Sequence, residues 1–324
     1  MRVLLCGGGG YIGTHVALEF LKRGDTVAVF DDLSSGLREN ISKQSLFYEG
    51  SINNKEDLKT VFKESWDVVI HLAAFKAAGE SMLNPTKYAF NNINGSLNLI
   101  AACAESNVKN FILSSSAAVY GEPHYLPIDE NHPTEATNYY GYTKLAIEQN
   151  LAWYNKLKNL NYVSLRYFNA AGYDVNKKMT NLERNPANLI PVVMEVAIGK
   201  RPCIEIFGND YPTEDGTGVR DYIHVTDLAD AHVKASDYLL NNKSPLIVNL
   251  GSEKGISVRQ IIEEARLITK MKIAEKVTAR RPGDPAKLIA SSAKAKEVLG
   301  WKANYSDLRT IIESTWEVYK LNIS

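Results

Sequence analysis

A run of four glycines at residues 7–10, followed by Gly13, constrains this chain more than any other feature of its sequence. A short apolar run, residues 3–6, precedes the glycines, and apolar residues at helical spacing follow from Ile12 to Leu21. The pattern predicts a buried strand, a tight turn and a helix. Glycine lets the turn lie close to an anion, and a helix N-terminus directs free N–H groups and a positive dipole end towards it. The segment therefore predicts a phosphate-binding turn; the alternative is a tight turn without a ligand.

The spacing of these glycines is typical of dinucleotide-binding turns. Gly8-x-Gly10-x-x-Gly13 matches the general Rossmann fingerprint. Gly7-x-x-Gly10-x-x-Gly13 matches the looser spacing of short-chain dehydrogenases. Because all four positions in the run are glycine, the sequence does not decide between the two spacings.

A carboxylate follows the second apolar run and favours one nucleotide over another. Residues 27–30 form that run, which ends at Asp31, near the distance of ~20 residues at which an acidic side chain binds the adenosine ribose. A carboxylate accepts hydrogen bonds from the ribose hydroxyls and repels a 2′-phosphate, so the sequence favours NAD over NADP. The alternative is that Asp31 and Asp32 only cap the next turn.

Apolar runs and helical patterns alternate through the first half of the chain. Strands are predicted at residues 3–6, 27–30, 46–48, 67–72, 111–113 and 162–165, and helices after residue 11 and at residues 54–64, 85–106 and 139–157. Near-continuous apolar strands in this rhythm indicate parallel strands buried on both faces, with crossover helices. The expected fold class is α/β, a Rossmann-type doubly wound parallel sheet, whose ligands bind at the carboxyl ends of the strands.

The regular alternation stops near Tyr167, which predicts a second, smaller lobe. We assign residues 1–169 to an NAD-binding Rossmann domain, and residues 170–324 mainly to a mixed α/β C-terminal substrate lobe that is interleaved with the first domain. Within the lobe, the pattern predicts a loop at residues 170–186, turn-rich stretches at 208–218 and 281–285, and helices near 226–241, 257–269 and 305–320.

Charge and cysteine usage bear on the partners and the compartment. The 324 residues carry 37 lysines plus arginines and 37 aspartates plus glutamates, so a formal charge of zero offers no electrostatic argument for nucleic acid or a membrane partner. Three cysteines without paired spacing fit a reducing compartment. The chain opens on a strand rather than a signal peptide, and no apolar run approaches the ~20 residues of a membrane span. We expect a soluble, cytoplasmic protein, and, since the six histidines show no metal-ligand spacing, no metal.

A tyrosine and a lysine point to proton transfer. Tyr140 and Lys144 lie four residues apart at the start of a predicted helix, so both project from one face. A phenol has a pKa of about 10, but a nearby ammonium and the positive nicotinamide ring favour the phenolate, so the pair can act as base and acid near neutral pH. Three serines at a strand end, residues 114–116, supply a hydroxyl, whereas Tyr139 and Tyr142 have no lysine four residues on. The alternative is a surface Tyr–Lys pair without chemistry.

Five longer segments, together with the glycine turn and the Tyr140–Lys144 pair, resemble one family. They are residues 71–77 (HLAAFKA), 91–95 (NNING), 114–121 (SSSAAVYG), 165–169 (LRYFN) and 206–224 (IFGNDYPTEDGTGVRDYIH). These segments are similar to the UDP-glucose 4-epimerases, also called UDP-galactose 4-epimerases, within the extended short-chain dehydrogenase/reductase superfamily. The resemblance runs from Met1 to about Trp316 and implies an NAD-dependent isomerase of galactose metabolism.

The resemblance implies a mechanism for three residues. Tyr140 would take the proton from the sugar 4-hydroxyl while hydride leaves C4 for the nicotinamide, and Ser116 would hydrogen-bond the same oxygen. Lys144 would hold the nicotinamide ribose and lower the pKa of Tyr140. The 4-keto sugar then rotates and hydride returns to its other face, which interconverts UDP-glucose and UDP-galactose with NAD retained.

The resemblance also implies which residues bind each ligand. The residues implied at the cofactor are Gly7, Gly10, Tyr11, Ile12, Gly13, Asp31, Asp32, Ser35, Ser51, Ile52, Leu72, Ala73, Ala74, Lys76, Asn91, Ser114, Tyr140, Lys144 and Phe168. Those implied at the UDP-hexose are Ser116, Tyr140, Asn169, Asn188, Leu189, Phe207, Arg220, Arg281, Asp284 and Leu288. The helices at residues 85–106 and 139–157 pair across a dimer axis in this superfamily, so a homodimer is expected; the alternative is that they only pack on the sheet.

Two positions depart from the usual pattern or vary within the family. Ser51 stands where these enzymes usually have an aspartate that meets adenine. A serine retains one hydrogen bond, so we expect a weaker adenine contact rather than loss of NAD. Leu288 falls where the family varies between a bulky tyrosine and a smaller residue beside the sugar. The hypothesis is that leucine leaves room for an N-acetyl group, and hence for activity on UDP-N-acetylglucosamine and UDP-N-acetylgalactosamine.

Other functions on the same fold stay open at this point. A nucleotide-sugar 4,6-dehydratase needs an acid and a base directly after the strand-end hydroxyl, where this chain has Ala117 and Ala118. A nucleotide-sugar decarboxylase is opposed by the resemblance of residues 207–224. A non-catalytic NAD-binding regulator could lack Tyr140 or Lys144, and both are present. An oxidoreductase that releases NADH is the remaining alternative.

Overall fold

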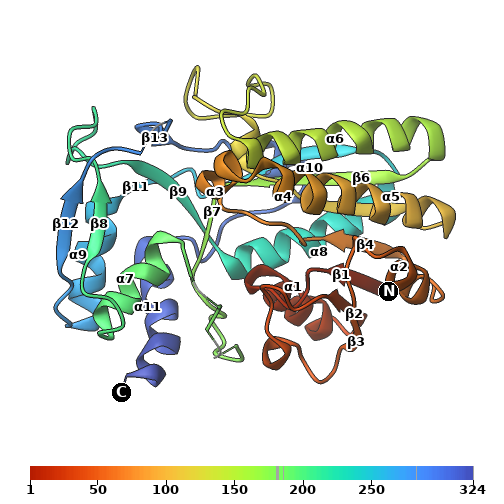
Figure 1. Ribbon diagram of the computed structural model, residues 1–324, viewed down its shortest axis with the longest axis horizontal. Coiled ribbons are helices and arrows are strands. Elements are labelled where there is room, and N and C mark those ends of the chain that lie inside the picture. The colour runs from red at the N-terminus through yellow and green to blue at the C-terminus, as the bar shows by residue number, and fades with distance from the viewer. Residues whose placement is uncertain (180–181, 185, 282, 324) are drawn as a thin grey trace.

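The structure is a computed structural model that describes residues 1–179, 182–184, 186–281 and 283–323. Seven parallel strands form its main sheet, in the order β10-β6-β5-β4-β1-β2-β3 (Figure 1). They are β1 (Arg2–Cys6), β2 (Thr26–Asp31), β3 (Leu46–Glu49), β4 (Val68–His71), β5 (Asn110–Ser114), β6 (Asn161–Tyr167) and β10 (Leu246–Leu250). The predicted Rossmann-type α/β fold is confirmed.

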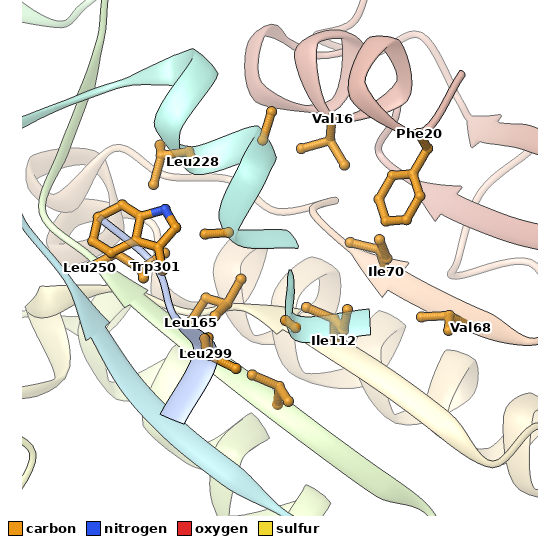
Figure 2. Close-up of a cluster of buried hydrophobic side chains, with 14 of the residues drawn as sticks. Val16, Phe20, Val68, Ile70, Ile112, Leu165, Leu228, Leu250, Leu299 and Trp301 are labelled. Atoms are coloured by element: carbon orange, nitrogen blue, oxygen red, sulfur yellow. The ribbon is translucent and has the colours of Figure 1, made fainter. Parts of the chain in front are cut away.

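Helices cover both faces of this sheet because its strands are apolar on both sides. One face packs on α1 (Tyr11–Lys22), α8 (Val225–Asn242) and α10 (Ala293–Leu299), and the other on α2 (Lys55–Val61), α5 (Gly95–Glu105) and α6 (Tyr139–Lys158). Figure 2 shows the first face, where Val16 and Phe20 of α1 lie over Ile70 and Ile112 of the sheet. All four side chains are completely buried.

The strand order reverses beside β1, and this reversal determines where the ligand-binding crevice of the sheet lies. From β1 the chain crosses to β2 on one side, whereas β4 pairs with the other side of β1. Ligands of doubly wound sheets bind outside the carboxyl ends of the strands at such a switch point. The glycine turn after β1 therefore lies in the crevice that the sequence predicts.

A second group of elements surrounds β9 (Val219–His224). This strand pairs with β7 (Asn169–Ala171) and β13 (Lys287–Leu288) in parallel and with β11 (Gly255–Ser257) in antiparallel. The remaining elements here are β8 (Ile204–Phe207) paired with β12 (Glu275–Thr278), and the helices α7 (Leu189–Ala197), α9 (Val258–Thr269) and α11 (Leu308–Tyr319). Buried isoleucines such as Ile190, Ile261 and Ile311 join the three helices into a core of their own.

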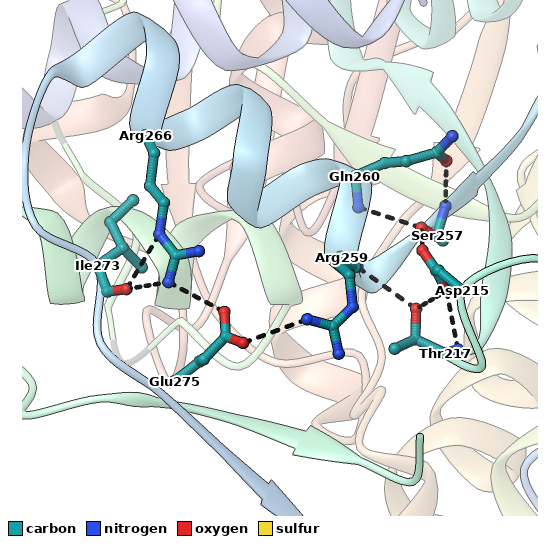
Figure 3. A network of polar contacts seen from close by, with 8 residues as sticks. All are labelled: Asp215, Thr217, Ser257, Arg259, Gln260, Arg266, Ile273 and Glu275. Atoms are coloured by element: carbon teal, nitrogen blue, oxygen red, sulfur yellow. Dashed lines mark hydrogen bonds and ion pairs between the residues drawn. The ribbon is translucent and has the colours of Figure 1, made fainter. Parts of the chain in front are cut away.

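Polar contacts fasten the start of α9 to the turn that leads into β9 (Figure 3). Ser257 and Gln260 form a reciprocal cap at the helix N-terminus. The Ser257 hydroxyl also donates to one carboxylate oxygen of Asp215. The other Asp215 oxygen accepts from the Thr217 amide at 2.8 Å and from the Thr217 hydroxyl at 2.7 Å. The cap therefore sets the conformation from which β9 begins.

The structure adds several elements that the sequence pattern did not assign. These are α3 (Ala78–Leu83), α7, α10, β7, β8, β9, β10, β11, β12, β13 and the short helical turns η1 (Arg38–Asn40), η3 (Ala117–Val119) and η4 (Lys320–Asn322). The helix predicted at residues 85–106 is divided into α4 (Pro85–Tyr88), a π-helical segment η2 (Ala89–Asn94) and α5. The domain boundary at residue 169 stays a prediction; β6 ends two residues before it, and β10, far beyond it, pairs with β6. Within the described ranges, no helix has the length and apolar character needed to span a membrane.

Candidate active site

The glycine turn is held by close approaches that only glycine permits. Gly7 has a φ of +84°, and a Cβ on it would lie 2.4 Å from the Ala73 amide nitrogen. A Cβ on Gly13 would lie 2.5 Å from the carbonyl oxygen of Gly7. Gly13 belongs to both candidate spacings, whereas Gly7 belongs only to Gly7-x-x-Gly10-x-x-Gly13. The positive φ of Gly7 and its approach to backbone atoms therefore favour that spacing.

The N-terminus of α1 fits a diphosphate. Its N-cap residue is Gly10, which has no side chain to accept from the first turn of the helix. A Cβ on Gly10 would meet a single atom within 4 Å, the Gly7 carbonyl oxygen at 3.5 Å. The space beside Gly10 is therefore open, and the amides of Tyr11, Ile12 and Gly13 lie at the helix end where an anion is stabilised.

Asp31 ties the end of β2 to the glycine turn. One carboxylate oxygen accepts from the Gly9 amide at 2.8 Å and the other from the Leu33 amide at 2.8 Å. Burial raises the pKa of Asp31, and the two backbone hydrogen bonds oppose that rise. A carboxylate with two accepted bonds retains lone pairs for ribose hydroxyls. Both acids also cap the following turn, since Asp32 accepts from the Ser34 amide at 3.0 Å.

The far side of the crevice is formed by the segment after β4. The amides of Leu72 and Ala73 donate to the Cys6 carbonyl at 2.8 and 3.0 Å, which brings this segment against the glycine turn. Ala74 follows, and the Lys76 ammonium lies 3.6 Å from the Glu183 carboxylate. Lys76 is thus paired with a residue of the segment at 170–186, which the sequence predicted only as a loop.

The remaining predicted cofactor residues occupy varied surroundings. The Asn91 side chain accepts from the side-chain amide of Asn53 at 3.3 Å, and the Ser51 hydroxyl accepts from the backbone N–H of Asn53 at 3.3 Å. Asn91 and Ser51 therefore share Asn53 as a neighbour. Ile52 is buried, whereas Ser35 and Asp32 are exposed at the crevice rim. The consequence of Ser51 for adenine binding stays a prediction.

Tyr140, Lys144 and Ser116 are brought together at the carboxyl end of β5. The Lys144 ammonium donates to the Ser114 carbonyl at 2.8 Å, and the Ser116 hydroxyl lies near the Tyr140 phenol. Burial raises the pKa of Tyr140, and the nearby Ser116 hydroxyl opposes the rise. Burial lowers the pKa of Lys144 to about 8, with Glu148 opposing.

This arrangement corrects one expectation about the phenol. The spacing of Tyr140 and Lys144 led us to expect that the ammonium lowers the pKa of the tyrosine, but in this structure the net direction is upwards. The physical reason is that the phenol is buried, while the ammonium is bound to the Ser114 carbonyl. Positive charge at the site, from Lys144 and from bound ligands, has to outweigh this effect of burial before the phenol ionises readily.

The second group of elements carries predicted substrate residues that contact one another. Arg220 on β9 forms an ion pair with Asp284. The Arg281 guanidinium lies 3.7 Å from the centre of the Phe207 ring, a cation–π arrangement. A small cavity of about 50 Å³ is lined by Asn169, Ala170, Ala171, Asn188, Leu189, Ile190, Pro191 and Tyr222.

Leu288 belongs to a small apolar cluster that joins the two sides. It packs with Phe168 against Val119 and Tyr120, and its strand partner in β9 is Arg220. Predicted cofactor and substrate positions therefore meet in one cluster. By contrast, Asp32 and Ser35 lie on the exposed turn after β2.

Comparison with known proteins agrees with this geometry. A profile of the NAD dependent epimerase/dehydratase family matches residues 3–251. The UDP-glucose 4-epimerase of Halalkalibacterium halodurans is 45% identical over 321 residues, which cover 99% of this chain and 96% of the relative. The chain belongs to the NAD dependent epimerase/dehydratase family.

Solved structures of this epimerase family have the same fold. A UDP-glucose 4-epimerase from Brucella ovis in complex with NAD has a TM-score of 0.95, 41% identity and coverage of 98% of each chain. One from Bifidobacterium longum in complex with NAD⁺ and UDP has a TM-score of 0.94, 37% identity and coverage of 99% of each chain. Each comparison therefore covers nearly the full length of this chain and of the solved chain.

The sequence analysis missed two residues beside the Tyr140–Lys144 pair. Burial raises the pKa of Tyr167, and both Tyr140 and Ser114 are near enough to influence it. Glu148 is buried on the same face of α6. Its spacing, four residues beyond Lys144, was visible in the sequence, but an acid at that spacing is as common on exposed helices as in active sites.

The glycine geometry predicts a specific loss of cofactor. Gly13→Ala should lower retention of NAD and destabilise the fold by ~1–3 kcal/mol, because the new methyl group overlaps the Gly7 carbonyl. Nucleotide extracted per chain and the unfolding midpoint measure the two effects. Gly79→Ala on α3 is the matched control, since no atom lies within 4 Å of its Cβ position. Full retention of NAD by Gly13→Ala would contradict the assignment of this turn.

Proposed function

We propose that this protein interconverts UDP-glucose and UDP-galactose as an NAD-dependent 4-epimerase. One observation carries the proposal: Tyr140, Ser116 and Lys144 supply a phenol, a hydroxyl and an ammonium at the carboxyl end of β5, on the sheet edge that also carries the glycine turn. Membership of the epimerase family and the match to UDP-glucose 4-epimerases over nearly the full length support it.

The chain's own residues then handle the proton, while NAD, when bound, supplies a reversible hydride acceptor for C4. Tyr140 would accept the proton of the 4-hydroxyl and later return it. Ser116, which lies near the phenol, would hold the same sugar oxygen. Lys144 would contribute positive charge that stabilises the phenolate and would bind the nicotinamide ribose.

The UDP portion would be held by the second group of elements. Arg220 and Arg281 suit the diphosphate, because a guanidinium pairs well with phosphate oxygens. Asp284, paired with Arg220, would accept from the nucleoside. Asn188 and Leu189 begin α7 beside the 50 Å³ cavity, where helix amides are available to the uracil. An anchor at the nucleotide end leaves the 4-keto sugar free to rotate.

The structure gives no support to a dehydratase. The residues after Ser116 are Ala117 and Ala118, which form the helical turn η3 and carry no group that transfers a proton. Elimination of water needs an additional acid and base at the sugar. The epimerase needs neither.

Removal of the phenol oxygen tests the proposal directly. Purified wild-type protein, given UDP-galactose without added NAD, should yield UDP-glucose in a chromatographic or NMR assay. Tyr140→Phe should reduce kcat by ~10²–10⁴-fold, the usual effect of losing a general base. Tyr142→Phe, two residues away and half exposed, should retain activity. The proposal fails if the wild type, even after NAD is supplied, leaves UDP-galactose unchanged.

We also propose that the protein accepts UDP-N-acetylhexosamines. Leu288 lies partly buried beside Phe168, and leucine occupies less space than tyrosine. Leu288→Tyr should lower kcat/KM for UDP-N-acetylglucosamine by ~10–200-fold, because the pocket loses room, while UDP-glucose turnover changes little. Leu288→Met, which nearly conserves volume, is the control. Absence of any wild-type turnover of UDP-N-acetylglucosamine would refute this extension.

Finally, we propose a homodimer that pairs the helices α5 and α6 of two chains. Trp153 and Leu157, one helical turn apart on α6, and Phe90, just before α5, are exposed. Light scattering should give twice the chain mass of 36.0 kDa for the wild type, and Leu157→Glu should shift the protein towards single chains. A wild-type mass of one chain at micromolar concentration would rule the dimer out.

A further inference from the structure

The helix that carries Tyr140 and Lys144 places a third polar side chain on the same face. Glu148 lies one further turn along α6, at the spacing that aligns side chains on a helix. It is 3% exposed. Nothing in the proposed mechanism uses it, and a carboxylate is costly to bury unless a partner compensates its charge.

Arg166 on β6 supplies that compensation. One Glu148 oxygen accepts from the Arg166 Nε at 3.0 Å and the other from an Arg166 terminal nitrogen at 2.5 Å, a two-pronged pair. A further Arg166 nitrogen donates to the Tyr120 hydroxyl at 3.0 Å, and that hydroxyl donates to Asn249 at 2.7 Å. The pair is thus hydrogen-bonded on both sides, which compensates the burial of its two side chains.

Glu148 also completes a ladder between the end of β5 and α6. The Ser115 hydroxyl donates to Glu148 at 2.5 Å. Beside it in the chain, the Ser114 carbonyl accepts from the Lys144 ammonium at 2.8 Å. Two successive serines therefore hold two side chains, Lys144 and Glu148, that lie one helical turn apart.

The charges around Lys144 single out Glu148. The titratable groups on the elements packed against Lys144 include Tyr140 and Glu148 on α6, His71 on β4, Tyr162, Arg166 and Tyr167 on β6, and His232 on α8 behind Ser114. Burial lowers the pKa values of His71 and His232 to about 3 and about 4, so both rings are neutral at physiological pH. Glu148 is the anion of this set that favours the Lys144 ammonium.

We propose that Glu148 is a positioning residue: its carboxylate, paired with Arg166 and bonded to Ser115, keeps Lys144 charged and in place on the Ser114 carbonyl. The expected effect on turnover rests on the proposed function, in which the ammonium is the working form of Lys144. The expected effect on the charge of Lys144 does not rest on it.

The direct test is the titration of Lys144 in the purified protein with the nucleotide it carries. Protein labelled with ¹³C-lysine is titrated by NMR of the ε-methylene signals, and the signal absent from Lys144→Met assigns the residue. Glu148→Gln keeps the size of the side chain and removes its charge. The titration midpoint of Lys144 should fall by about one pH unit, a tenfold loss of ammonium above the midpoint.

A matched control and a second variant secure the result. Asp227→Asn removes a buried, hydrogen-bonded carboxylate from α8 and should leave the midpoint unchanged. If Glu148→Gln does not fold, Glu148→Gln with Arg166→Met leaves no buried charge unpaired. Its midpoint should also fall, by less, because the repulsion from Arg166 disappears as well. A midpoint that does not move in the folded variant overturns the proposal.

The pH dependence of turnover separates this inference from the proposed function. Lys144 is active as a cation, so activity is present below its pKa and is lost as the pH rises through it. In Glu148→Gln, the falling limb of kcat/KM should move to lower pH by the same amount as the NMR midpoint. A limb that stays in place while the midpoint falls refutes the role in turnover. A wild type without epimerase activity refutes the proposed function, while the NMR titration still decides the role of Glu148.

Discussion

The burial of both faces of the seven-stranded sheet is the constraint on which the rest of this structure depends. Successive residues of a central strand, such as Leu4 and Leu5, point to opposite faces of the sheet and pack under different layers of helices. Both are completely buried. With both faces covered, polar chemistry is confined to the strand ends, where backbone groups are not used by the sheet. The glycine turn, Asp31 and the three serines all lie at that edge.

The main sheet and the elements around β9 present different kinds of side chains for the proposed function. The main sheet presents side chains held rigidly by strand ends and by α6, which suits proton transfer because small displacements weaken it. The elements around β9 present Arg220, Asp284 and Arg281, which suit an anionic nucleotide. The chain passes from β6 to β7 within two residues, so the two groups meet without a linker.

Much of the fold follows from local pattern, and the exceptions have physical causes. The predicted strand at residues 3–6 and helix at 139–157 match β1 and α6 to within one residue. The π-helical segment at Ala89–Asn94 was not anticipated, because a single inserted residue barely alters helical periodicity. β10 joins the sheet through pairing with β6, some eighty residues earlier, and such pairing leaves no mark on neighbouring residues.

The sequence by itself determined that a glycine turn follows a buried strand, and that Tyr140 and Lys144 share a helix face, because both are matters of local spacing. Tertiary structure alone decided what these groups touch. Lys144 is bound to a carbonyl thirty residues away, and burial, rather than the neighbouring ammonium, sets the direction of the Tyr140 pKa. Contacts and desolvation depend on how distant segments pack, and no periodicity along the chain encodes them.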